Sequence, residues 1–552
     1  MKRLVILGGG TAGTMIANKL RAALGKHELH ITVVDRDDAH HYQPGYLFMP
    51  FGIYNTSDIV RSRHKFISDG VDLVLTEIDQ VDPNYRVVHL ADGRTLSYDV
   101  LVIATGVSPR PDATPGMQGK LWGEKVHEFY SLAGAQALTE AMRRFRGGRL
   151  VVHITEMPIK CPVAPMEFTF LADDWLRKHG IRERTELSYV TPLDGAFTKP
   201  VASRELATAL TDRQITLETD FAVESIDNDA AELVSFDGRR IGFDLLVTVP
   251  LNMGADYIAR SGLGDELNLV PCDQHTMVSL AHPDIYVLGD AGTLQTSKAG
   301  SVAHFAADVF VQNFLAEHRG EPATHGFDGH ANCFIESGNS KGMLLDFNYT
   351  TEPFTGNFPM PVVGPFKLLK ETHLNHLGKL AFRWIYWNML LPGRPIPMIP
   401  TAMSLAGKRV EKQVSAEATG MPSIGAPSSP PPPRATVASP TPEELRTRDS
   451  TTPTPEELPT RDSRTPAPEE LGERDSRTPA PEELRERSER SVTKGRAPAR
   501  PKAAPIAKPK AAATPSATKP NPVPGGGYVD RPGVDSTADP ATVLPDPIIP
   551  KF

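Results

Sequence analysis

The 552-residue sequence is poor in cysteine and has no long apolar run. Three cysteines exclude a secreted scaffold held together by disulfides. No stretch approaches the roughly 20 apolar residues that a membrane-spanning helix needs. The first apolar run, residues 4–7, ends in glycines rather than in a signal-peptide cleavage site. The net charge of −8 excludes a surface that attracts nucleic acid throughout. We expect a soluble acidic protein of a reducing compartment, with no nucleic-acid partner.

The C-terminal end lacks the residues that build a core. Residues 421–552 contain no tryptophan or cysteine, two aromatics and 28 of the 51 prolines. Such a segment cannot offset its ordering entropy by burial, so residues 411–552 are predicted to be a disordered tail. Four 13-residue repeats within it each carry Pro-Glu-Glu-Leu, beginning at Pro442, Pro455, Pro468 and Pro481. The basic run at 494–519 is typical of a solvated linker, although anionic lipid or another polyanion would also bind it.

The N-terminal end carries a dinucleotide-binding pattern. A short apolar strand at 4–7 precedes Gly8-Gly9-Gly10-Thr11-Ala12-Gly13 and an amphipathic run at 15–24. A second strand at 31–34 ends in Asp35. Glycines in this position allow a tight turn and a close approach to a pyrophosphate, and the acid accepts hydrogen bonds from a ribose.

A second copy of the pattern follows about 145 residues later. The hairpin and strand at 87–103 correspond to those at 233–248, and the strand at 4–7 corresponds to 150–153. The pattern predicts an α/β fold with two Rossmann-like dinucleotide-binding domains, the second inserted in the first. We expect the first part of the FAD-binding domain at 1–110, the second domain at 111–255, the return to the first at 256–330, and a C-terminal region at 331–410.

The second copy lacks the features that bind a nucleotide. Its turn, residues 154–161, contains no glycine, and Glu156 places a negative charge where a pyrophosphate would lie. The strand at 187–190 ends in Thr191-Pro192 instead of an acid. We therefore expect one dinucleotide, bound to the first copy.

Two later segments complete the first site. The strand at 101–103 leads into Ala104-Thr105-Gly106, and the strand at 285–288 leads into Gly289-Asp290. Together with the N-terminal glycines these segments resemble flavin disulfide-reductase-like proteins, in which the aspartate holds the ribityl chain of FAD. The resemblance predicts FAD as the cofactor, bound by Gly8, Gly9, Gly10, Thr11, Ala12, Gly13, Asp35, Thr105, Gly106, Gly289, Asp290, Lys298 and Gly300. No metal site is predicted.

Cys161 is the leading candidate for a reactive residue. It replaces the second phosphate turn and precedes a helix that Pro165 opens and Gly180 closes. A helix N-terminus and the neighbouring Lys160 both favour a thiolate, so we expect a lowered pKa at Cys161. Cys272 has the setting of a structural residue, and the sequence alone does not place Cys333 near Cys161.

The C-terminal region contains an amphipathic segment. Residues 374–391 place Leu374, Leu377, Ala381, Trp384, Ile385 and Leu391 at helical spacing. Trp384, Tyr386 and Trp387 lie together, and Lys367, Lys370 and Arg394 flank the segment. This pattern predicts a helix that lies in a membrane interface with its aromatics at headgroup depth, and a core-facing helix is the alternative.

The combined motifs resemble the sulfide:quinone oxidoreductase family over residues 1–400. The resemblance rests on the glycine turn, Ala104-Thr105-Gly106, Lys160-Cys161-Pro162, Gly289-Asp290, Lys298-Ala299-Gly300, Cys333-Phe334 and His376-Leu377-Gly378-Lys379. It implies that sulfide attacks a disulfide or sulfur-bridged pair of Cys161 and Cys333 and leaves a persulfide on Cys161. It further implies that the Cys333 thiolate adds to the flavin ring and reduces FAD, which passes two electrons to a membrane quinone. Phe334 and Phe366 are the implied quinone contacts, and Lys298 and Gly300 lie beside the flavin.

The sequence departs from the family at two places. Val126-His127-Glu128-Phe129 stands where some members have a third redox cysteine, and Gly195-Ala196-Phe197 stands where some have a histidine. These departures leave open the sulfur product, the electron acceptor and the natural substrate. The alternatives are a flavin sulfide dehydrogenase that delivers electrons to a cytochrome, a type II NADH:quinone oxidoreductase, against which the glycine-free second turn argues, and a non-catalytic membrane-docked flavoprotein scaffold. The expected location is peripheral, on the cytoplasmic face of a membrane and in contact with its lipid. The sequence is compatible with a homo-oligomer and with a partner that binds the tail.

Overall fold

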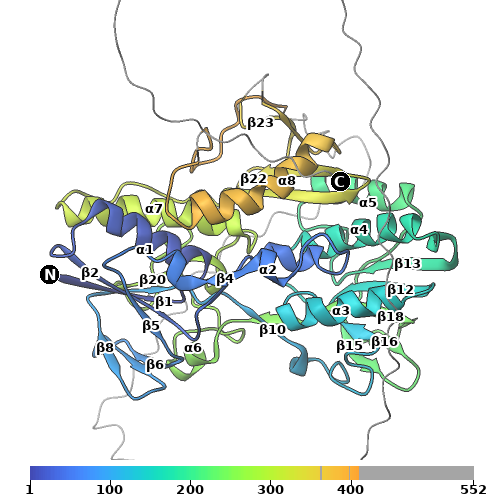
Figure 1. Cartoon of the computed structure of the whole chain (residues 1–552), viewed down its shortest axis with the longest axis horizontal. Helices are drawn as coiled ribbons and strands as arrows, with labels where there is room; N and C mark the ends of the chain where they lie inside the picture. The colour runs from blue at the N-terminus through green and yellow to red at the C-terminus, as the bar shows by residue number, and fades with distance from the viewer. Residues whose placement is uncertain (361–363, 397, 410–552) are drawn as a thin grey trace, which may run out of the picture. The chain divides into compact units, whose positions relative to one another are not determined.

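Two parallel sheets, one on the left and one on the right of Figure 1, organise the described residues. The computed structural model describes residues 1–360, 364–396 and 398–409. The prediction of a disordered tail at 411–552 lies outside these residues. The strands of the first sheet are, in spatial order, β20 (Ile285–Val287), β9 (Val100–Ile103), β1 (Lys2–Leu7), β2 (Leu29–Asp35) and β5 (Asp72–Leu75). Those of the second are β11 (Val126–His127), β18 (Leu245–Val249), β12 (Gly148–Ile154), β13 (Thr185–Val190) and β14 (Thr216–Glu218).

Four of the five strands have the same order in the two sheets, and only the edge strand differs: β20 comes last in the chain of the first sheet, whereas β11 comes first in that of the second. The central strand, β1 or β12, is paired in parallel with the strand after the next helix on one side and with a later strand on the other. The central residues of β1, β9, β12 and β18 are fully buried, as expected of parallel strands that are covered on both faces. The mixed α/β class with parallel sheets is therefore confirmed.

A small antiparallel sheet accompanies each copy. It consists of β6 (Ile78–Asp82), β7 (Val87–Leu90) and β8 (Thr95–Ser97) in the first copy. The second has β15 (Val223–Asp227), β16 (Glu232–Ser235) and β17 (Arg240–Gly242). Gly93 and Gly238 occupy the matching hairpin turns, both with positive φ.

Helices cover the sheets. Helix α1 (Thr11–Ala23) packs against α7 (Gly300–His318), which lies beside it in Figure 1. The second sheet is accompanied by α3 (Leu132–Arg144), α4 (Ala164–Lys178) and α5 (Pro200–Asp212). Short helices α2 (Thr56–Ile59) and α6 (Asp256–Arg260) and the paired strands β3 (Ala39–His41) with β4 (Val60–Ser62) and β10 (Ser108–Arg110) with β19 (Leu251–Met253) connect these elements.

A third sheet follows the two copies. Its order is β21 (Ala331–Gly338), β22 (Lys341–Phe347), β24 (Phe366–Leu368), β23 (Thr355–Phe358) and β25 (Lys408–Arg409). Strand β21 packs against α4, and α8 (His373–Ile385) packs on β21 and β22. A π-helical turn, Tyr386–Leu390, continues from α8. Within the described ranges, no helix combines the length and apolar character that crossing a membrane requires.

The burial of the aromatic residues after α8 differs from the expectation. Trp384 is exposed, but Tyr386 and Trp387 are only 3% and 2% exposed. Tyr386 lies against Tyr42, and Trp387 stacks on Phe66. The π-helical turn directs these two rings into the first domain, so the expectation that all three lie at headgroup depth was wrong.

Candidate active site

The glycine turn after β1 passes very close to another strand end. Gly8 has a φ of +98°, and a Cβ placed there would lie 2.5 Å from the carbonyl oxygen of Ala104. Only glycine fits both the conformation and this contact. The turn is thereby held against residues 104–106, the second segment that the sequence predicted for the site.

Asp35 supports the turn from the end of β2. The Gly9 N–H donates to Asp35 Oδ2 at 2.8 Å, and Arg63 Nη1 lies 3.1 Å from the same oxygen. Burial raises the pKa of Asp35, whereas the positive charge of Arg63 lowers it. The Arg63 guanidinium also donates to the carbonyl oxygens of Gly9 and Ala39. Arg63 was not predicted, because no sequence pattern relates it to a turn 54 residues earlier.

One cavity gathers most of the predicted cofactor residues. Its lining includes Gly10, Thr11, Ala12, Thr105, Gly106, Gly289, Asp290, Lys298 and Gly300, together with Cys161. Added Cβ atoms at Gly10, Gly106 and Gly300 would meet nothing within 4 Å, so the backbone borders open space at these three positions. Gly8, Gly9, Gly13 and Asp35 lie behind the lining and shape the turn.

Two lysines lie near Asp290 in the wall. Lys298 is buried and donates from Nζ to the carbonyl oxygens of Asp290 and Gly292, at 2.7 and 2.8 Å. Burial raises the pKa of Asp290, while the charges of Lys298 and Lys160 lower it. Burial lowers the pKa of Lys298, and Asp290 opposes that shift. This side of the cavity can therefore neutralise an anionic group.

The backbone groups in the turn of the second copy are already hydrogen-bonded to other parts of the protein. The Cys161 N–H donates to the Lys298 carbonyl oxygen at 2.6 Å, and the Lys160 N–H donates to Asn252 Oδ1 at 3.3 Å. Tyr130 Oη donates to the Cys161 carbonyl oxygen at 3.2 Å. Cys161 itself has a φ of +49°. These backbone groups are not available to a pyrophosphate.

A buried ion pair lies next to the cysteines. Lys379 Nζ is 2.7 Å from Glu167 Oε1 and 2.9 Å from the Phe334 carbonyl oxygen. The Glu336 N–H donates to the same glutamate oxygen at 2.9 Å, and His376 Nδ1 lies 2.8 Å from Glu336 Oε2. Burial lowers the pKa of Lys379, but the charges of Glu167, Cys161 and Glu336 and the hydrogen bond to Glu167 together outweigh it, and the net pKa is raised. Lys379 was part of the sequence motif, whereas Glu167 was missed.

The electrostatics of the cysteines correct the prediction for Cys161. Desolvation, followed by the charge of Glu167, raises the pKa of the Cys161 thiol, and Lys379 opposes the shift. Desolvation raises the pKa of Cys333 to about 12, again opposed by Lys379. The expected lowering through Lys160 was wrong, because the side chain of Lys160 turns to Gln43 Oε1, 3.0 Å away. Lys379, 218 residues after Cys161 in the chain, is the cation that favours both thiolates.

Cys333 and the predicted quinone contacts lie on the third sheet. Cys333 and Phe334 belong to β21, and Phe366 begins β24. Neither Cys333 nor either phenylalanine is part of the cavity lining. The charge of Cys333 nevertheless raises the pKa of Cys161, which places the two thiols within electrostatic range of each other. Phe334 and Phe366 meet edge to face, with ring centroids 5.3 Å apart.

The C-terminal π-helical turn supplies a further wall of the cavity. Tyr386 and Leu390 line it, and Tyr386 Oη lies 2.9 Å from Thr11 Oγ1 and 2.8 Å from His40 Nε2. Burial lowers the pKa of His40 to about 3, so this histidine is neutral. The sequence placed Tyr386 in a membrane interface, and no pattern indicated its contact with the first turn.

The comparisons with known proteins agree with this geometry. Residues 2–307 match the family described as pyridine nucleotide-disulphide oxidoreductase. The chain belongs to this family. Among its relatives, the mitochondrial sulfide:quinone oxidoreductase of Dictyostelium discoideum is 27% identical over 399 residues, which cover 71% of this chain and 86% of that protein. A type II NADH:quinone oxidoreductase of Staphylococcus epidermidis is 28% identical, but over only 119 residues, 21% of this chain and 29% of the relative.

A solved structure has a similar fold. The sulfide:quinone oxidoreductase of Aquifex aeolicus superposes with a TM-score of 0.60 at 19% identity, over 71% of this chain and 92% of that one. This match extends beyond residues 2–307, the part that the family description covers. The likeness supports the arrangement of sheets described above.

Proposed function

We propose that the protein is an FAD-dependent sulfide:quinone oxidoreductase. It oxidises sulfide to sulfane sulfur through Cys161 and Cys333 and passes the electrons to a membrane quinone. The observation that carries the proposal is the position of Cys161: it lines the same cavity as the glycine turn, in the place where the second copy would otherwise bind a nucleotide. The sulfide:quinone oxidoreductases among the relatives match most of the chain, which supports the same conclusion.

The cavity residues fit FAD. Gly8 and Gly13 form the tight turn, the first N–H groups of α1 have no side-chain cap, and open space lies beside Gly10, Gly106 and Gly300. A helix N-terminus of this kind is suited to a pyrophosphate. Asp290 would hold the ribityl chain, and Asp35 the ribose side of the turn. When bound, FAD accepts an electron pair from a thiolate and passes it on to a quinone.

The sulfur chemistry belongs to the two cysteines. In the oxidised protein they form a disulfide, and hydrosulfide attacks the sulfur of Cys161. A sulfur–sulfur bond forms to the substrate, the Cys161–Cys333 bond breaks, and Cys333 leaves as a thiolate. A second hydrosulfide removes the outer sulfur as HS₂⁻ and leaves Cys161 as a thiolate. The Cys161–Cys333 bond then forms again as the two thiolates give up two electrons, which bound FAD would accept. The overall change is 2 HS⁻ → HS₂⁻ + H⁺ + 2 e⁻, and the quinone takes up two electrons and two protons.

Lys379 and Glu167 would control the charge of the thiols. The Lys379 ammonium lowers the pKa of both cysteines, and Glu167 raises it. A thiolate released at Cys333 therefore lies in the field of a paired cation rather than in an uncompensated apolar site. Since Lys379 also donates to the Phe334 carbonyl oxygen, it joins the cysteine pair to the proposed quinone contacts, Phe334 and Phe366.

Helix α8 would bring the protein to the lipid surface. Leu374, Leu377 and Trp384 follow one another at intervals of three and seven residues and are 51%, 57% and 62% exposed. Residues at this spacing share a helix face. The exposed cations Lys367, Lys370 and Arg394 lie near the ends of α8 and suit lipid phosphates. This arrangement favours peripheral attachment, and we also propose the cytoplasmic face and the domain division given above.

The test is anaerobic reduction of the purified flavoprotein, followed by visible absorbance with sulfide and NADH in parallel. We expect sulfide to bleach the flavin and NADH to leave it unchanged. Bleaching by NADH would support a type II NADH:quinone oxidoreductase and contradict our interpretation of the second turn. No response to either reductant would favour the non-catalytic scaffold. A sulfide-reduced protein that reoxidises with cytochrome but not with a short-chain quinone would favour the sulfide dehydrogenase.

A further inference from the structure

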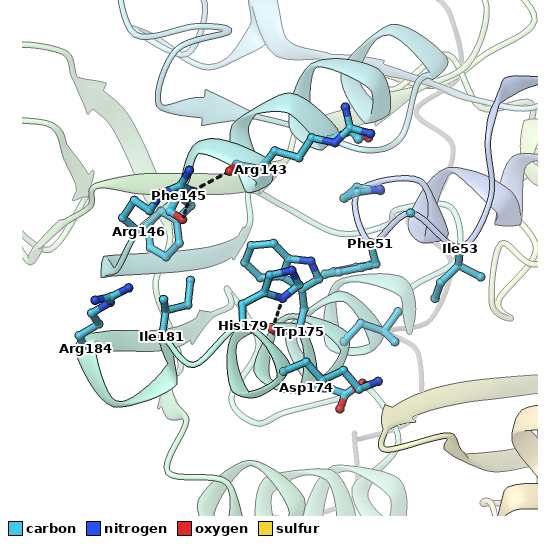
Figure 2. A pocket seen from close by; sticks show the side chains of 15 residues that line it. Phe51, Ile53, Arg143, Phe145, Arg146, Asp174, Trp175, His179, Ile181 and Arg184 are labelled. Atoms are coloured by element: carbon cyan, nitrogen blue, oxygen red, sulfur yellow. Dashed lines mark hydrogen bonds and ion pairs between the residues drawn. The ribbon is translucent and has the colours of Figure 1, made fainter. Parts of the chain in front are cut away.

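A second hollow lies away from the redox cavity. It has a volume of about 640 Å³ and is formed by residues 50–53, the C-terminal halves of α3 and α4, and the segments that precede β12 and β13 (Figure 2). Phe145 and Arg146 lie just before β12, whereas the turn that carries Cys161 follows the other end of that strand. The hollow is therefore at the opposite end of the second sheet from the proposed flavin site, and the proposed reaction does not use it.

The hollow is positively charged in a chain of net charge −8. Its lining contains Arg143, Arg146, Lys178 and Arg184, and Asp174 is the one carboxylate among the lining residues. Lys178 neutralises that carboxylate, with Nζ 2.7 Å from Asp174 Oδ2. Three arginines thus remain without a carboxylate partner in the lining.

Helix ends explain some of these charges but not all. Arg143 and Lys178 lie in the last turns of α3 and α4, where cations interact favourably with the helix dipole. Arg143 is also paired with Glu140 at 2.7 Å. Arg146 donates from Nη1 to the carbonyl oxygens of Arg143 and Phe145. Arg184 belongs to neither helix, and its side chain forms no hydrogen bond or ion pair with any described residue (1–360, 364–396, 398–409).

An aromatic pair lies at the centre of the hollow. The rings of Trp175 and His179 are stacked at 3.9 Å with an interplanar angle of 26°. Figure 2 shows them between Arg143, Arg146 and Arg184, with Phe51 beside them. Apolar side chains of Phe51, Leu171 and Ile181 complete the lining. A flat aromatic surface surrounded by guanidinium groups is complementary to a ligand that has both a planar ring and phosphate groups.

We propose that this hollow binds a phosphorylated ligand with a planar ring, of the nucleotide class. Its phosphates would lie between Arg146 and Arg184, and its ring would lie on the Trp175–His179 pair. The volume is within the range of small-molecule sites, roughly 300–1,000 Å³. The site is distinct from the flavin cavity, because the two share no lining residue.

The test is binding of ATP to the purified holoprotein by isothermal titration calorimetry, with pyrophosphate and adenosine as separate probes. We expect ATP to bind more tightly than pyrophosphate, and pyrophosphate more tightly than adenosine. Loss of a charged contact predicts that Arg184→Gln weakens ATP binding by about tenfold and the Arg146→Gln/Arg184→Gln pair by more. Arg204→Gln is the matched control, since Arg204 is an exposed arginine of α5 that has no side-chain partner in the described residues.

Each outcome decides a part of the proposal. Absence of ATP binding at millimolar concentration would overturn it, as would equal affinities in the wild type and the double variant. Equal binding of ATP and pyrophosphate would overturn the role of the aromatic pair. Unchanged melting temperature and retained flavin absorbance in the variants establish that a lost affinity is not lost folding. None of these readouts depends on sulfide oxidation.

Discussion

The two Rossmann-like copies have similar sheets and differ most clearly at one turn. Four of the five strands have the same order in both sheets, and β1 and β12 occupy the same central position. After β1 the chain forms a glycine turn against Ala104, whereas after β12 it forms a turn that carries Cys161. The comparison shows that the sheet determines where the turn after its central strand lies, and that the residues of this turn determine whether it binds a nucleotide or carries a reactive thiol.

The backbone contacts of the two turns explain that difference. In the first copy, Gly10 and Thr11 face open space in the cavity, and α1 begins without a side-chain cap. In the second, the N–H groups of Lys160 and Cys161 are bonded to Asn252 and Lys298. The first turn is built to receive an anion, and the second is fixed so that a thiol lies in the same cavity.

The largest effect is expected at the second turn. Cys161→Ser removes the sulfur that hydrosulfide attacks, and we expect it to slow flavin reduction by sulfide by at least about 1,000-fold. Stopped-flow absorbance under anaerobic conditions measures this rate. Cys272→Ser is the control, because Cys272 is a buried cysteine outside the cavity and should retain the wild-type rate. Equal rates in the two variants would contradict the role assigned to Cys161.

The corresponding test of the first turn is Gly8→Ala. The added Cβ would be strained at φ +98° and would meet the Ala104 carbonyl, so we expect FAD binding to weaken by about 3 kcal/mol, roughly a hundredfold. The flavin-to-protein absorbance ratio after dialysis measures this loss. Gly93→Ala and Gly238→Ala have similar φ values, but the added Cβ meets nothing within 4 Å. If these two control variants lose as much flavin as Gly8→Ala does, backbone strain at positive φ rather than the contact with the Ala104 carbonyl is responsible for the loss.

Substitutions of the two partners of the buried ion pair, Lys379 and Glu167, should shift the pH–rate profile in opposite directions. Lys379→Met removes the cation that lowers the pKa of Cys333, the thiol released as a thiolate, so the pH–rate profile for sulfide should move to higher pH, with about a 30-fold lower rate at pH 7. Glu167→Gln removes the charge that raises the pKa of Cys333, and its profile should move to lower pH. Lys160→Met tests the neighbour that the sequence favoured, and it should shift the profile less than Lys379→Met.

The smallest expected effect concerns a buried histidine in each copy. Burial lowers the pKa of His40 and of His153 to about 3, from the ordinary histidine pKa of about 6.5. The unfolded chain therefore binds more protons between pH 3 and 6.5, and stability falls as the pH decreases through this range. Each histidine should cost roughly 1 kcal/mol at pH 5.5 relative to pH 7.

The controls are His40→Gln and His153→Asn, which place an amide near the nitrogen that is hydrogen-bonded in the native protein. Denaturant unfolding at pH 5.5 and 7 should show that each substitution reduces the acid-induced loss of stability. An unchanged loss in both variants would show that other groups are responsible.

Much of this comparison could be predicted from the sequence, because it rests on local patterns. Short apolar strands, the glycine turn and the aspartate that follows Gly289 are separated by intervals that recur in the second copy. Glu167, Arg63 and the cavity-facing role of Tyr386 could not be predicted, since each acts through a partner more than 50 residues away in the chain. The pKa of Cys161 is raised and not lowered as predicted, and the cause is the same. The side chain of Lys160, the neighbour in sequence, points to Gln43, and the cation that lowers the pKa of Cys161 comes from α8.

The wall that Tyr386 adds to the cavity also sets an order of events during synthesis. Thr11 is made early, but the cavity is closed only after residues 386–390 have been added. Thr11 and Tyr386 are 375 residues apart in the chain. At about 5–20 residues per second, this separation corresponds to roughly 19–75 s of translation. The first turn therefore waits on the ribosome for the residue that completes its wall.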